Sequence, residues 1–179
     1  MTWLYVLIGI AAVIVLWWII TSNGFKKKDL KTKESLSGIE VALTKRYDTL
    51  VKMKDVAKGY ADHEKEVLTD TVRLRKGMSA AELNEASNAM NSLEKSINVV
   101  AENYPALRAA DVFIQLQEAV RDAEEHLQAA RRLYNSTATS YNTDLVIFPK
   151  SIVANAMKLE KHELFVADEA KRADVDMKF

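Results

Sequence analysis

The chain has 179 residues, of which 49% are hydrophobic and 28% are charged, yet it contains only five Gly and two Pro. An all-β sandwich or barrel needs a turn about every 8–12 residues, and a doubly wound α/β fold uses glycines in its tight turns, so long helices remain. The lack of Cys excludes disulfides and thiolate chemistry. The 25 basic and 25 acidic residues balance, which leaves no overall positive charge to attract nucleic acid.

Residues 1–25 predict a transmembrane anchor. Residues 3–20 are apolar throughout, and as a helix they span about 27 Å, close to the thickness of a hydrocarbon core. Aromatic rings that favour the membrane interface stand at both ends of this run, namely Trp3, Tyr5, Trp17 and Trp18. The alternative is a cleaved signal peptide, which needs a basic start and small residues after the apolar run; this sequence has neither.

Residues 26–36 form a basic juxtamembrane linker that predicts the orientation. Its lysines are Lys26, Lys27, Lys28, Lys31 and Lys33. The positive-inside rule places this flank and everything after it in the cytoplasm, with the short N-terminus outside. The same lysines either act only as this topology signal or also contact anionic lipid headgroups.

Residues 37–160 show apolar side chains every three or four positions and predict an all-α, elongated antiparallel bundle of about four helices. The first stripe runs over residues 36–72, through Leu43, Tyr47 and Leu50, and should end near Gly77. Ser37 and Glu40 form a capping-box pattern that would start this helix, unless the helix continues from the membrane segment without a break.

The remaining elements follow in order. Ser79 and Glu82 form a second capping box that opens the next helix, and Pro105 closes it. A third stripe covers residues 113–148. Pro149 stops it and is placed to start a short fourth helix over residues 151–160. The C-terminal tail, residues 161–179, should pack back on the bundle.

The predicted first and third helices are longer than the second. Part of their apolar stripes would therefore stay uncovered, unless the tail or a second copy of the chain covers it. The sequence thus allows a homo-oligomer without requiring one.

Helical bundles can hold a di-iron centre, which needs a Glu three residues before a His on two helices. None of the three histidines has that glutamate; the residues in its place are Tyr60, Ala123 and Leu159. The nucleophile elbow G-x-S-x-G and the glycine-rich phosphate loops are also missing. We therefore expect no catalytic residue, no cofactor, no metal, no small-molecule substrate and no nucleic-acid partner.

Some residues do not fit a simple amphipathic pattern. Glu64 falls where the first stripe requires an apolar residue, and Arg131 and Asn135 flank the core position Tyr134. They form either a structural network that fixes the register of the helices or an interaction site, because buried polar groups must find partners. Gly59 interrupts a helix, which suggests close contact with another helix at that point.

Four blocks of sequence carry a resemblance to a known family. They are K-G-Y-x-x-H-E at residues 58–64, A-E-x-Y-P-x-L at 101–107, A-R-R-x-Y-N at 130–135 and Y-N-x-x-x-x-x-F-P at 141–149. Together they resemble the LemA family of bacterial membrane-anchored helical proteins. The resemblance implies a helical bundle on a single N-terminal span in the bacterial inner membrane, with no established enzymatic activity. The chain departs from the family at residues 50–53, which lack the usual proline, and at residues 158–159, where Lys-Leu replaces Gly-Phe.

The expected function is a membrane-anchored cytoplasmic scaffold or adaptor that contacts membrane lipid and an unidentified protein partner. Its binding face would lie around Tyr60, Glu64, Arg131 and Asn135. The alternative is a membrane-organising protein that assembles with itself. The residues expected to form an interaction site or a structural network are Lys58, Gly59, Tyr60, His63, Glu64, Glu102, Tyr104, Pro105, Arg131, Tyr134, Asn135, Tyr141, Asn142, Phe148 and Pro149.

Overall fold

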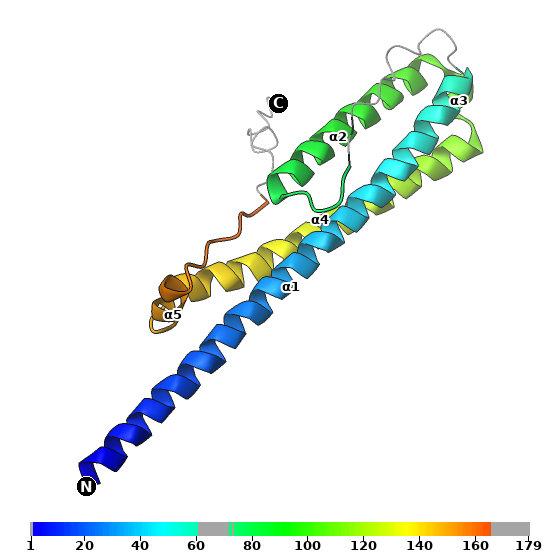
Figure 1. Cartoon of the computed structure of the whole chain (residues 1–179). Coiled ribbons are helices and arrows are strands. Elements are labelled where there is room, and N and C mark those ends of the chain that lie inside the picture. Colours follow the sequence, from blue (N-terminus) through cyan, green and yellow to red (C-terminus); the bar gives the residue numbers. More distant parts are fainter. Residues whose placement is uncertain (1, 61–71, 73, 166–179) are drawn as a thin grey trace, which may run out of the picture.

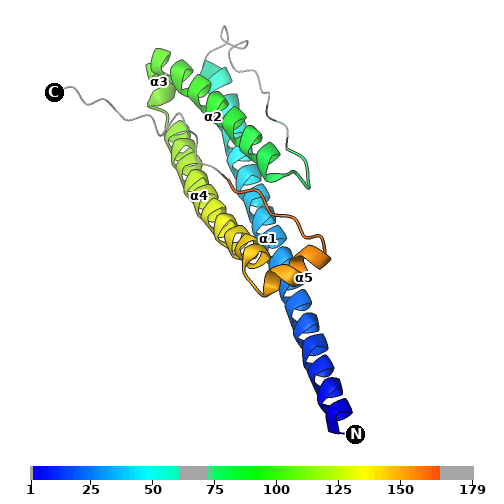
Figure 2. The same cartoon turned by 90° about the vertical axis from the view of Figure 1, so that its left-hand side faces the viewer.

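The computed structural model describes residues 2–60, 72 and 74–165. In this part of the chain all regular structure is helical: α1 (Thr2–Tyr60), α2 (Ala80–Asn103), α3 (Pro105–Arg108), α4 (Asp111–Val146) and α5 (Lys150–Ala156). α4 returns alongside α1, and α2 packs on this pair over the half that lies farther from the N-terminus (Figures 1 and 2). The prediction of an all-α, elongated bundle is confirmed.

α1 is a single unbroken helix of 59 residues, about 88 Å long. It contains one stretch long and apolar enough to cross a membrane: its most apolar 18-residue window has a mean hydropathy of 2.5, and none of it is buried. This first part of α1 extends beyond the rest of the bundle (Figure 1). The linker residues do not interrupt the helix, since lysine, leucine and glutamate favour it.

Of the two predicted starts for the first bundle helix, the continuous one is confirmed: Ser37 and Glu40 lie inside α1, so the capping box does not form. The Glu40 carboxylate instead accepts a hydrogen bond from the backbone N–H of Gly77, at 3.0 Å. The predicted helix end near Gly77 is wrong, since Val72 and residues 74–79 are not helical. His63 and Glu64 lie outside the described residues.

The helix starts and ends predicted at Ser79, Pro105 and Pro149 are confirmed. The Ser79 hydroxyl accepts from the Glu82 N–H at 3.2 Å, and the Glu82 carboxylate accepts from the Ser79 N–H at 2.8 Å, so the second capping box forms. α2 ends before Tyr104, and Pro105 begins the single turn of α3. α5 begins after Pro149, but it ends at Ala156 and is shorter than predicted.

The main core lies between α1, α2 and α4. α1 contributes a stripe that includes Ile39, Leu43, Leu50 and Met53, and the facing side chains include Leu83, Met90 and Ile97 of α2 and Phe113 and Leu127 of α4; all are essentially buried. Burial of a large aliphatic or aromatic side chain contributes about 1.5–3 kcal/mol. In the half of the bundle farther from the N-terminus, which we call the distal half, these side chains form a core shared by three helices.

The half nearer the N-terminus is closed differently. α2 does not reach it, and the segment 157–165 after α5 runs back along α4 instead (Figure 1). Phe165 joins the main core edge-to-face with Tyr134, with 5.3 Å between ring centroids. A second cluster joins Phe25 and Trp17 of α1 to Tyr141, Leu145 and Val153. The tail, as far as it is described, therefore covers the helical length that α2 leaves open.

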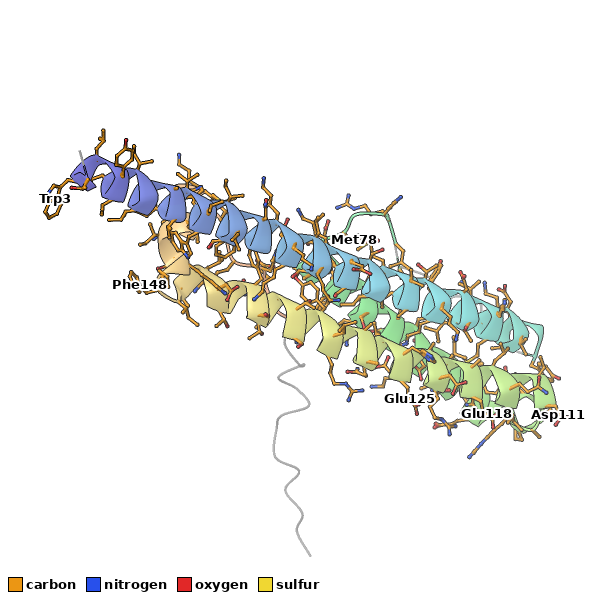
Figure 3. All side chains as sticks on the ribbon, turned by 90° about the horizontal axis from the view of Figure 1, so that it is seen from below. Trp3, Met78, Asp111, Glu118, Glu125 and Phe148 are labelled. Carbon is orange, nitrogen blue, oxygen red and sulfur yellow. The ribbon has the colours of Figure 1, made fainter. Side chains whose placement is uncertain are left out.

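Phe148 was expected to end the apolar stripe of the third helix, and this expectation is wrong. α4 ends at Val146, and the Phe148 side chain is 76% exposed in the turn before α5. It lies at the end of the bundle nearer Trp3, opposite Asp111 (Figure 3).

Two glycines differ in their backbone requirements. Gly59 has helical geometry, and a Cβ there would meet no heavy atom within 4 Å in the described part of the chain, so the expected close helix contact is not present. Gly77 has a φ of +79°, a left-handed backbone conformation that residues with a Cβ atom rarely adopt.

Substitution of the two glycines by alanine should change stability in opposite directions. We expect Gly59→Ala to raise the free energy of unfolding by up to about 1 kcal/mol, because alanine favours the helix. Gly77→Ala should lower it by about 1 kcal/mol. Urea unfolding of the detergent-solubilised chain, followed by far-ultraviolet circular dichroism, measures both; changes of the same sign would contradict this assignment.

Candidate functional site

A buried arginine joins the three long helices. Arg46 of α1 is 2% exposed. Its Nη2 donates to Asn91 Oδ1 and to Glu94 Oε2 of α2, both at 2.8 Å, and its Nη1 lies 2.9 Å from Glu124 Oε2 of α4. The planar guanidinium offers donors in several directions, so one side chain fixes α1 against both neighbours.

Sequence reasoning missed Arg46, although a signal was present. The buried positions of α1 include Leu43, Arg46, Leu50, Met53 and Ala57, at alternating spacings of three and four. Arg46 therefore occupies a core position, whereas the predicted stripe ran through Tyr47. An arginine at a core position of an amphipathic stripe requires acidic partners on the facing helices.

Loss of the Arg46 side chain should destabilise the bundle strongly. We expect Arg46→Ala to lower the free energy of unfolding by about 3 kcal/mol, because Glu94 and Glu124 then lose their shared cation. Arg132→Ala, at an exposed position of α4, is the matched control and should change stability by less than about 0.5 kcal/mol. Equal effects of the two variants in urea unfolding would disprove the role of Arg46.

Two asparagines of α4 bind the returning tail through paired hydrogen bonds. Asn142 Nδ2 donates to the carbonyl of His162 at 2.8 Å, and the His162 N–H donates to Asn142 Oδ1 at 2.9 Å. Asn135 makes the same pair with Phe165, at 2.8 and 2.9 Å. Each carboxamide thus supplies the donor and the acceptor that an adjacent β-strand would supply. We call these two pairs the asparagine clasp.

The spacing of the clasp matches two different backbone repeats. Seven residues along a helix, from Asn135 to Asn142, advance about 10.5 Å. Three residues of extended chain, from His162 to Phe165, advance about 10 Å. Both asparagines therefore meet their partners at the same time, and a slip of the tail by one residue would break both pairs.

Neighbouring side chains complete this network. The Tyr134 hydroxyl donates to the carbonyl of Glu163 at 2.8 Å, and burial raises the pKa of that hydroxyl. The Arg131 guanidinium lies 5.6 Å from the ring centroid of Phe165. The rings of Tyr141 and His162 lie 4.8 Å apart. Arg131, Tyr134, Asn135, Tyr141 and Asn142, which the sequence marked as candidates, are therefore brought together against the chain's own tail.

The other candidates lie elsewhere. Glu102, Tyr104 and Pro105 stand at the junction of α2 and α3. Lys58 and Tyr60 are in the last turn of α1, about 20 Å beyond Arg46 along the helix. Arg131 and Asn135 lie in the opposite direction from Arg46 along the axis of α1, because Thr137, close to them on α4, pairs with Ser35 at 3.4 Å. Tyr60 is therefore far from Arg131 and Asn135 along the bundle, and the prediction that they form one binding face is wrong in that respect.

Removal of either clasp asparagine should release the tail. Asn135→Ala or Asn142→Ala removes two hydrogen bonds, together about 2 kcal/mol, and should accelerate hydrogen exchange at the amide of Phe165 or His162, respectively. Mass spectrometry of peptides that contain residues 161–165 measures this. Asn88→Ala, at an exposed position of α2, is the control; unchanged exchange in the tail of both clasp variants would contradict the clasp.

Carboxylates at the end of the bundle nearer the apolar segment are paired with bases. Asp29 lies 2.9 Å from His162 Nε2 and 2.7 Å from Lys33 Nζ. Asp144 lies 2.7 Å from Lys28 Nζ and 2.9 Å from Lys150 Nζ. Burial opposes ionisation of both carboxylates, but the hydrogen bonds and charges of these partners outweigh it and lower both pKa values. Of the linker lysines, Lys28 and Lys33 thus bind acids within the chain, whereas Lys26, Lys27 and Lys31 are exposed.

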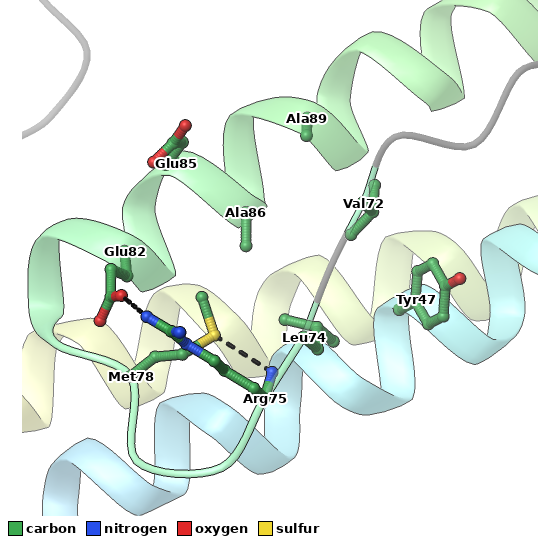
Figure 4. A pocket seen from close by; sticks show the side chains of 9 residues that line it. All are labelled: Tyr47, Val72, Leu74, Arg75, Met78, Glu82, Glu85, Ala86 and Ala89. Carbon is green, nitrogen blue, oxygen red and sulfur yellow. Dashed lines mark hydrogen bonds and ion pairs between the residues drawn. The ribbon is translucent and has the colours of Figure 1, made fainter.

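A cleft of about 770 Å³ lies where Val72 and residues 74–79 cross α1 and α2 (Figure 4). Its surface combines apolar and charged groups: Tyr47, Val72, Leu74, Arg75, Met78, Glu82, Glu85, Ala86 and Ala89. Arg75 and Glu82 form an ion pair at its edge. Within the described residues no group of three or more His, Asp or Glu side chains is arranged to hold a metal ion.

The fold and these contacts define a class: an elongated all-α bundle whose first helix includes a candidate membrane span. The LemA family model matches residues 35–179, and the chain belongs to the LemA family. It is 28% identical over 159 residues to Protein LemA of Metamycoplasma hominis, an alignment that covers 86% of this chain and 73% of that protein.

Proposed function

We propose that this chain is a single-pass membrane protein whose cytoplasmic bundle acts as a scaffold or adaptor and has no catalytic activity. The observation that carries the proposal is the continuity of α1. One helix contains both the exposed apolar segment and the stripe that forms the core with α2 and α4. The anchor and the bundle are thus a single rigid element.

This continuity gives the bundle a defined position relative to the membrane. Residues 26–60 of α1 extend about 53 Å beyond the apolar segment. Arg46 and the asparagine clasp fix α2, α4 and the tail on this rod. A partner bound to the bundle would therefore be held at a set height above the bilayer, on the cytoplasmic side that the linker lysines favour.

A protein partner would bind in the cleft beside Val72 and residues 74–79. Leu74, Met78 and Ala86 supply an apolar surface, and Arg75 and Glu85 supply charged groups near it. Such a combination suits an amphipathic segment, whose apolar side chains enter the cleft while its polar ones meet the charged edge.

Chemical cross-linking of the full-length chain in intact bacterial membranes tests the proposal. We expect a cross-linked product with a different polypeptide, and Ala89→Trp should abolish it because the indole fills the cleft. Ala119→Trp, at a half-buried position of α4 outside the cleft, should leave the product unchanged.

The same experiment separates the alternative, a membrane-organising protein that assembles with itself. A ladder of products that contain only this polypeptide would favour self-assembly and would contradict the adaptor. No product of either kind, at cross-linker concentrations that capture known membrane complexes, would contradict both.

A further inference from the structure

Large apolar side chains are exposed together where α4 ends and α5 begins. Val146, Ile147 and Ile152 are about half exposed and Phe148 is 76% exposed, the most exposed phenylalanine of the described chain. Other exposed apolar side chains of the bundle, such as Leu30, Val41 and Leu133, stand singly along the chain, whereas these four fall within residues 146–152. An adjacent set of four exposed apolar residues on a bundle marks a surface that another apolar medium covers.

This set, which we call the α4–α5 turn, lies level with the end of the apolar segment of α1. Val153 and Ala154 of α5 belong to the cluster that contains Phe25 and contacts Trp17. Trp17 and Trp18 mark the end of the apolar run, where indole rings prefer the membrane interface. If those rings lie at the interface, the turn beside them reaches the same depth; Figure 3 shows Phe148 at this end of the bundle.

The charges around the turn are suited to a headgroup region. No acidic or basic residue occurs from Leu145 to Pro149. The acid that precedes it, Asp144, is paired with both Lys28 and Lys150, so it presents no uncompensated negative charge to anionic lipid. Lys26 and Lys27 are exposed on the neighbouring turn of α1 and supply positive charge at the same level.

We propose that the α4–α5 turn is a second membrane contact, which inserts Phe148 and its apolar neighbours into the interfacial region of the leaflet from which α1 emerges. The inference rests on the membrane anchorage in the proposed function. Lipid is favoured over a protein partner because α5 packs against Phe25 and Trp17, which holds the exposed set beside the end of the apolar segment of α1. With two contacts, the bundle is fixed in tilt and in rotation about α1 as well as in height.

Because the chain has no cysteine, single cysteines can report the depth of individual positions. We suggest Phe148→Cys, with Ile152→Cys as a second variant, in the full chain in vesicles of phosphatidylethanolamine and phosphatidylglycerol. Each is labelled with an environment-sensitive fluorophore, and circular dichroism verifies folding. Leu133→Cys, at an exposed apolar position in the middle of α4, is the aqueous control, and Ile14→Cys in the apolar segment is the membrane control.

The expected result is quenching of the labels at positions 148 and 152 by spin-labelled lipid, as at position 14, with a several-fold lower accessibility to an aqueous quencher than at position 133. If position 14 is quenched by lipid and positions 148 and 152 behave like position 133, the second contact is wrong and the anchor stands. If position 14 also fails to respond to lipid, the anchorage itself is wrong. Protection at positions 148 and 152 from both quenchers would indicate a protein cover and would overturn the proposal.

Discussion

The structure depends on one constraint: α1 presents two kinds of surface without a break in its backbone. A helix satisfies its own backbone hydrogen bonds, so the same element can be exposed at one end to an apolar medium and packed against protein at the other. Only the side-chain pattern changes, from apolar on all sides to a stripe with spacings of three and four. α4, α2 and α5 each take their position from contact with this helix.

Apolar stripes alone leave the relative register of long helices weakly defined, because a shift by one turn still places apolar groups opposite each other. The polar contacts remove this freedom. Arg46 needs acceptors on α2 and α4 at the same level, and a displaced helix would leave a charge buried without its partners. The asparagine clasp acts similarly on the tail, with hydrogen-bond pairs in place of charge.

Elements determined by neighbouring residues could be predicted from the sequence. The capping box at Ser79 and the stops at Pro105 and Pro149 involve contacts within a few residues, and their signals were sufficient. The end of α1 and the exposure of Phe148 were not predicted correctly, since each depends on the packing of distant segments. The family blocks identified Asn135 and Asn142, but their partners lie 30 and 20 residues away in a tail with little periodicity. Only the folded structure shows that the extended residues 162–165 lie beside α4 with a spacing that matches its two asparagines.

The closure of the bundle by its own tail has a consequence for biosynthesis. The distal core requires only α1, α2 and the first half of α4, so it can assemble while the ribosome still holds the rest of the chain. The half nearer the apolar segment of α1 lacks its cover until residues 162–165 have left the exit tunnel. Folding of this half is therefore completed only after the distal core has formed.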